Sequence, residues 1–183
     1  MKMMKHLLIA MLVLVLLAGC AQPEVPEAPV TAEPAATETD HEGVKAPDFT
    51  VYDKDGNPVK LSDFVGKPVV LNFWASWCGP CKMEMPDFNE KYLELGNDVQ
   101  FLIVNMTDGN SETVDSAYAF IESMGYEFPV FYDTAMSAAY AYGVNAIPAT
   151  YFIDADGYAI TYSVGAMDAD TLQQAIDLIY TKP

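Results

Sequence analysis

The chain has 183 residues and a formal net charge of −17, with 51% hydrophobic and 12% aromatic residues. This length supports one domain with a substantial core and is too short for two domains of ordinary size. The acidic charge and the lack of arginine in the sequence argue against nucleic-acid binding and against electrostatic docking on a membrane, because both need basic contacts. The charge is more typical of a soluble surface than of recognition of a charged ligand.

The first 19 residues are typical of a secretory signal segment. Two lysines precede an apolar stretch over residues 7–18, which is too short for a membrane-spanning helix of a mature protein. The segment ends in Leu17-Ala18-Gly19-Cys20, which resembles the lipobox of bacterial lipoproteins. That resemblance implies that residues 1–19 are removed and that Cys20 carries a lipid anchor, whereas an ordinary cleaved signal would leave Cys20 incidental.

Residues 20–44 differ in composition from the rest of the chain. After Cys20 they are rich in proline, alanine, glutamate and threonine. Proline stiffens such a segment and like charges extend it. We therefore expect a semi-rigid tether between the lipid and a domain that occupies residues 45–183.

The domain begins with a predicted β-hairpin. Thr50–Asp53 and Pro58–Leu61 flank an Asp-Gly turn, and Ser62–Phe64 can form a short helical turn. The remaining pattern predicts, in chain order, a buried strand over Lys67–Trp74, a helix over Lys82–Leu95, a strand over Val99–Met106, a helix over Ser111–Met124 capped by Ser111, a strand over Phe128–Phe131, a helix over Thr134–Tyr142, strands over Ala149–Ile153 and Tyr158–Val164 around a second Asp-Gly turn, and a helix over Asp168–Tyr180.

Two cysteines three residues apart indicate the chemistry. In Trp77-Cys78-Gly79-Pro80-Cys81, Cys78 stands at the predicted strand-to-helix turn and Cys81 lies one helical turn further on. The unpaired N–H groups and the dipole of a helix N-terminus favour a negative sulfur, which lowers the pKa of the Cys78 thiol. We expect an exposed, nucleophilic Cys78 and a buried Cys81. A zinc site is disfavoured, because the chain has no second cysteine pair and both histidines, His6 and His41, precede the domain.

From about Ala46 to Tyr180 the chain resembles the thioredoxin superfamily, and more closely its TlpA/ResA-like branch of membrane-tethered proteins. The strongest matches are Phe73–Cys81 with Glu84 and Pro86 following, then Ile147-Pro148, and then Val164-Gly165-Ala166. The resemblance implies an α/β thioredoxin fold, with a central mixed β-sheet flanked by helices. An N-terminal β-hairpin extension and a βα insertion over residues 107–128 would be added to it. We expect a monomer that needs no cofactor and no metal.

The resemblance also implies roles for individual residues. Cys78 would attack a partner disulfide and Cys81 would resolve the mixed disulfide, so that the pair alternates between dithiol and Cys78-Cys81 disulfide. Ile147-Pro148 would be the family's cis-proline segment, although an ordinary edge-strand proline is the alternative. The other residues implied for a shallow substrate groove are Trp77, Gly79, Pro80 and Gly165.

Two positions depart from thioredoxin itself. Asn72 replaces the buried aspartate that thioredoxins carry beneath the resolving cysteine, and Glu84 matches an acid of the TlpA/ResA-like branch. Our hypothesis is that Glu84 is partly buried, has a raised pKa and handles the proton of Cys81. The alternative is a solvated helix glutamate. We interpret Pro86 as a structural helix kink, and Met83 and Met85 as packing residues rather than a copper site.

The implied activity is extracytoplasmic thiol-disulfide exchange at a bacterial membrane. Gly79-Pro80 matches the dipeptide of thioredoxin, whose potential of about −270 mV is reducing, so we favour reduction of oxidised exported proteins. By resemblance, apocytochrome c is one plausible target and a membrane thiol-transfer protein is the electron donor. The alternatives are a thiol peroxidase on the same fold and a non-enzymatic copper-chaperone or binding lipoprotein. The loop over Thr107–Asn110 could help to select partners.

Overall fold

The computed structural model describes residues 43–182. The predicted signal segment, the lipid anchor at Cys20 and nearly all of the predicted tether lie outside the described residues. No helix among residues 43–182 has both the length and the apolar character needed to cross a bilayer.

All the strands and helices predicted from residue 50 onwards are present. The elements in chain order are β1 (Val44–Lys45), β2 (Thr50–Tyr52), β3 (Pro58–Lys60), the 3-10 turn η1 (Leu61–Phe64), β4 (Val69–Trp74), α1 (Gly79–Leu95), β5 (Gln100–Asn105), α2 (Val114–Met124), β6 (Val130–Tyr132), α3 (Ser137–Ala141), β7 (Ala149–Ile153), β8 (Tyr158–Val164) and α4 (Ala169–Asp177). The two-residue strand β1 was not predicted, because two residues carry no periodicity.

The strands form one mixed sheet in the order β1-β8-β7-β4-β5-β6-β2-β3. β4, β5 and β6 run parallel, and β7 runs antiparallel to β4, with Ala149 opposite Phe73. The first residue of β7 therefore lies beside the end of β4. This pairing brings the residues just before β7 close to the Cys-x-x-Cys turn that follows β4.

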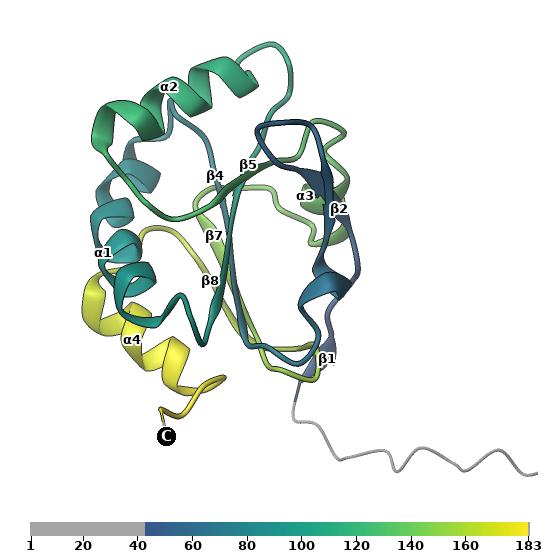
Figure 1. The fold of residues 1–183 in the computed structure, drawn as a ribbon, viewed down its shortest axis with the longest axis vertical. Helices are drawn as coiled ribbons and strands as arrows, with labels where there is room; N and C mark the ends of the chain where they lie inside the picture. The colour runs from purple at the N-terminus through teal and green to yellow at the C-terminus, as the bar shows by residue number, and fades with distance from the viewer. Residues whose placement is uncertain (1–42, 183) are drawn as a thin grey trace, which may run out of the picture. The chain divides into compact units, whose positions relative to one another are not determined.

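Helices cover both faces of the sheet. Figure 1 shows α1, α2 and α4 on one side and α3 on the other. On the first side Val70 and Trp74 of β4 pack with buried residues of the three helices, and on the second Leu71 and Phe73 pack with α3 and the β2–β3 hairpin. All six residues of β4 are buried, as expected for a strand covered on both faces. The predicted thioredoxin-like α/β fold is confirmed.

The start of α1 differs from the sequence prediction. The helix begins at Gly79 rather than Lys82, with Cys78 as its N-cap and a proline in its first turn. A proline there needs no N–H partner and has a suitable φ. The sulfur of Cys78 therefore lies directly at the helix N-terminus.

The predicted cap of α2 is wrong. The helix starts at Val114 and Thr113 is its N-cap, in a reciprocal arrangement in which Ser116 N donates to Thr113 Oγ1 and Thr113 N donates to Ser116 Oγ. Ser111 instead donates its hydroxyl to Asp108 Oδ2 in the preceding loop. Both Ser111 and Thr113 are good capping residues by type, and the loop geometry decides between them.

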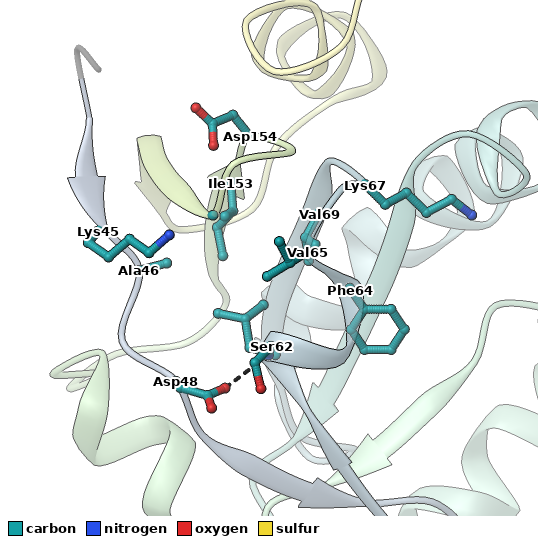
Figure 2. Close-up of a pocket in the computed structure, with 12 residues that line it drawn as sticks. Lys45, Ala46, Asp48, Ser62, Phe64, Val65, Lys67, Val69, Ile153 and Asp154 are labelled. Atoms are coloured by element: carbon teal, nitrogen blue, oxygen red, sulfur yellow. Dashed lines mark hydrogen bonds between the residues drawn. The ribbon is translucent and has the colours of Figure 1, made fainter. Parts of the chain in front are cut away.

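A cavity of about 90 Å³ lies at the N-terminal end of β4, between that strand and the segment that follows β1. Figure 2 shows it lined mainly by apolar side chains, with Ser62 N donating to Asp48 Oδ1 at one edge (3.0 Å). Because β4 has six residues, about 17 Å separate its two ends. The cavity is therefore not part of the cysteine site.

Candidate active site

Cys78 and Cys81 form a disulfide at the first turn of α1. The backbone N–H of Cys81 donates to Cys78 Sγ (3.2 Å), and Cys78 N donates to Ala75 O (3.1 Å), which closes the turn after β4. A helix N–H directed at the first sulfur would stabilise a thiolate there after reduction. The predicted position of the redox pair is thus confirmed.

The expected exposure of Cys78 is wrong in this disulfide state. Cys78 is only 4% exposed and Cys81 is fully buried, whereas the neighbouring Trp77 is 58% exposed. Cys78 Sγ lies 3.7 Å from Ile147 O, and this is a contact rather than a hydrogen bond, because a disulfide sulfur carries no hydrogen. The Ile147-Pro148 segment therefore lies against the sulfur that was expected to face solvent.

The Ile147–Pro148 peptide bond is cis, as the resemblance implied. Pro148 precedes β7, which lies between β4 and β8 within the sheet, so the alternative of an ordinary edge-strand proline is wrong. Gly165 N donates to Pro148 O (2.8 Å), and Gly165 has φ 101°, which favours glycine. The fold thus joins three segments that are distant in sequence, around Cys78, Pro148 and Gly165.

A buried polar cluster joins α1, one helical turn beyond Cys81, to β4 and β7. Glu84 is 2% exposed, and its carboxyl group accepts hydrogen bonds from Asn72 Nδ2 (2.9 Å) and Met167 N (3.1 Å). Asn72 Nδ2 also donates to Thr150 Oγ1 (2.9 Å). Burial raises the pKa of Glu84 to about 7, although both hydrogen bonds oppose that rise. The alternative of a solvated glutamate is therefore wrong.

Comparison with known proteins supports this geometry. A family model described as the AhpC/TSA family matches residues 43–162. The chain belongs to the AhpC/TSA family. It is similar to the thiol-disulfide oxidoreductase ResA of Bacillus subtilis (strain 168), with 34% identity over 146 residues that cover 79% of each chain.

Two solved structures are similar over most of their length. One is assigned as the thiol:disulfide interchange protein DsbE from Chlorobium tepidum, with 36% identity, a TM-score of 0.67 and coverage of 75% of this chain and 96% of that one. The other is the exposed lipoprotein thioredoxin Etrx1 from Streptococcus pneumoniae strain TIGR4, with 32% identity, a TM-score of 0.64 and coverage of 72% and 99%. The chain is therefore a ResA-like thiol-disulfide oxidoreductase of the thioredoxin superfamily.

The remaining predicted site residues of this oxidoreductase lie around the same turn. Trp77, Gly79 and Pro80 are exposed beside the disulfide, so their role in a substrate groove stays a prediction. Met85 is buried in the core, as one of the two packing positions predicted for these methionines, and Met83 is 69% exposed. Pro86 lies inside α1.

One buried acid near the site was not predicted from the sequence. Glu112, in the loop before α2, is 1% exposed and accepts hydrogen bonds from Ser76, two residues before Cys78. Thirty-six positions separate the two residues, and no local pattern links them.

Proposed function

We propose that the oxidoreductase reduces disulfide bonds in exported proteins, acting outside the cytoplasm from a lipid anchor at Cys20. The observation that carries the proposal is the pairing of the Cys78-Cys81 disulfide at the start of α1 with Glu84, a buried acid one helical turn beyond Cys81. A pKa of about 7 lets this acid take up or release a proton at physiological pH.

The reaction begins with the reduced enzyme. The Cys78 thiolate attacks one sulfur of the partner disulfide, so that a mixed disulfide forms and the partner's other sulfur leaves as a thiolate. The Cys81 thiol then loses its proton to the Glu84 carboxylate and attacks Cys78 Sγ, which releases the second partner sulfur. The partner gains two electrons and the enzyme ends as the Cys78-Cys81 disulfide.

Two features support reduction as the direction. The dipeptide Gly79-Pro80 is that of thioredoxin, a reductant at about −270 mV. In addition, the carboxylate form of Glu84 disfavours nearby thiolates, and a less stable dithiolate makes a stronger reductant. If the protein equilibrated with glutathione near about −120 mV, the potential of a strong disulfide donor, the proposed direction would be wrong.

The anchor and the location are supported by the lipobox-like residues 17–20 and by the similarity to Etrx1, which is described as an exposed lipoprotein. A membrane thiol-transfer protein would then supply electrons. Expression of the full chain with Cys20→Ala tests the anchor: the unchanged chain should fractionate with membranes and incorporate labelled fatty acid, and the variant should do neither. Incorporation of label by the variant would contradict an anchor at Cys20.

The decisive experiment for the substrate is to capture partner proteins as mixed disulfides on Cys78. With Cys81→Ser the mixed disulfide on Cys78 cannot be resolved, so exported partners should accumulate as adducts that dithiothreitol releases. Apocytochrome c, through its haem-binding Cys-x-x-Cys-His disulfide, is the target we expect to find among them. The matched control is Cys78→Ser, which should trap nothing. A peroxide-consumption assay on the unchanged protein separates this function from a thiol peroxidase.

A further inference from the structure

Glu112 is a buried acid that the exchange mechanism does not use. Of the carboxyl side chains within residues 43–182, only Glu84, Glu112 and Asp133 are buried. Glu84 belongs to the cluster that joins α1 to β4 and β7, and Asp133 accepts a hydrogen bond from Ala139 N at α3. Glu112 alone is joined to the chain immediately before Cys78.

The Glu112 carboxylate binds the turn that precedes Cys78. Its Oε2 accepts from both Ser76 N (2.9 Å) and Ser76 Oγ (2.8 Å), and its Oε1 accepts from Ser116 Oγ (3.0 Å). The turn has one internal bond, from Cys78 N to Ala75 O. Glu112 therefore adds a second, external restraint to Ser76, which is bonded directly to the exposed Trp77.

The loop that carries Glu112 is held in shape by its own hydrogen bonds, independently of Ser76. Asp108 Oδ1 accepts from Asn110 N (2.8 Å) and Glu112 N (2.9 Å), and Gly109 N donates to Glu112 O (2.9 Å). The hydrogen bonds from the backbone N–H groups of Glu112 and Asn110 lower the pKa of Asp108 to about 2, so Asp108 remains an acceptor at any physiological pH. The capped start of α2 fixes Ser116, the third donor. A side chain held in this way needs little further ordering to bind its target.

We propose that Glu112 is a positioning residue for thiol-disulfide exchange: it holds the Ser76–Trp77 turn in place, and its negative charge disfavours the Cys78 thiolate. The proposal deepens the oxidoreductase activity and does not depend on the direction of exchange or on the substrate. In this proposal the inserted segment before α2 acts at the active site through Glu112. The other ionisable groups near the turn are the Cys81 thiol of the reduced protein, Glu84, Asp108 and Lys82. The Lys82 ammonium lies 5.9 Å from the centre of the Phe120 ring. All four groups are unchanged in the variants below, so differences report on Glu112.

Two substitutions separate charge from geometry. Glu112→Gln keeps the length and an acceptor for Ser76 but removes the charge. In the reduced full chain, the midpoint of iodoacetamide alkylation of Cys78 against pH, followed by mass spectrometry, should move to lower pH. At one pH unit below the midpoint of the unchanged protein, Cys78 of the Glu112→Gln variant should be alkylated about three- to tenfold faster than Cys78 of the unchanged protein. The equilibrium with glutathione should shift toward the dithiol, because a more stable thiolate favours the reduced form.

Glu112→Asp keeps the charge but is too short to reach Ser76 in the same position. The plateau rate constant at high pH for reduction of insulin disulfides should fall about tenfold, with a much smaller change in the alkylation midpoint. Glu122→Gln, an exposed acid on α2, is the control and should change neither quantity. An unchanged midpoint in folded Glu112→Gln, or an unchanged plateau in folded Glu112→Asp, overturns the proposal. If near-UV circular dichroism shows that Glu112→Gln does not fold, the plateau rate constant of Glu112→Asp alone tests the proposal.

Discussion

Glu84 and Glu112 are both buried glutamates beside the same disulfide turn, but their surroundings differ. Glu84 lies on α1 and accepts two hydrogen bonds, from an asparagine side chain and a backbone amide. Glu112 lies in a structured loop and accepts three, two of them from one serine. The partners of Glu84 do not offset the cost of burying its charge, so its pKa rises to about 7. Glu84 is therefore suited to exchanging a proton, and Glu112 to holding backbone in place.

The largest effect on the Glu84 site is expected from a substitution at Asn72. Asn72→Asp puts a second carboxyl group where an amide now donates to Glu84. Two buried carboxylates in contact repel each other, so we expect the oxidised protein to lose about 3–5 kcal/mol of unfolding free energy at pH 8. The loss should be much smaller at pH 5, where Glu84 is protonated and can donate.

Urea denaturation at both pH values measures this effect. Asn145→Asp, at an exposed position, makes the same chemical change away from Glu84 and should cost little. A loss that is equal at pH 5 and pH 8 would contradict the assignment of the cost to charge repulsion.

Glu84→Gln should remove the dependence of the unfolding free energy on pH that results from the raised pKa of Glu84. Because the folded pKa of about 7 exceeds the ordinary value of 4.5, the folded state binds the proton more tightly than the unfolded state. The contribution of Glu84 to stability is therefore fully present below about pH 4.5 and is lost as the pH rises through 7. Relative to the unchanged protein, the variant should gain up to about 3 kcal/mol between pH 4.5 and 8.

Denaturation curves at several pH values test this linkage. Glu122→Gln again serves as the control, since replacing an exposed glutamate should change the unfolding free energy by an amount that does not vary with pH. If the change caused by Glu84→Gln also does not vary with pH, the folded pKa of Glu84 is ordinary.

The same substitution should slow catalysis. If Glu84 accepts the proton of Cys81, its removal should lower the rate of mixed-disulfide resolution about 10- to 100-fold at pH 8. The inflection near pH 7 in the pH-rate profile should disappear with it. Stopped-flow measurement of the resolving step gives both quantities, and a profile that keeps its inflection would assign that inflection to another group.

The smallest expected effect concerns the region of Glu112. Thr113→Ala removes the N-cap of α2 and should cost about 1 kcal/mol of unfolding free energy. Ser111→Ala should cost less, because Ser111 only donates to Asp108 within an exposed loop. Thermal denaturation of the two variants side by side measures the difference, and the reverse order would contradict the cap assignment.

Local patterns alone predicted the order of the elements, both Asp-Gly hairpins and the cysteine pair at the start of a helix. Those patterns are the hydrophobic period, the turn residues and the spacing of Cys78 and Cys81. The cis-proline was implied instead by the resemblance to the thioredoxin superfamily. The burial of Glu84 was also predicted, through its match to an acid of the TlpA/ResA-like branch, whereas its hydrogen bond with Asn72 was not. The predictions for residues 1–42 fall outside the described residues and stay predictions.

Contacts between residues far apart in the chain follow from the three-dimensional fold. Ile147 lies against Cys78 because β7 pairs antiparallel with β4, and this contact buries a sulfur that its position in the turn predicted to be exposed. Glu112 reaches Ser76 because the loop after β5 folds back over the end of β4. Such contacts join segments that are far apart in the chain, and their energies depend on geometry that no local pattern of residues contains.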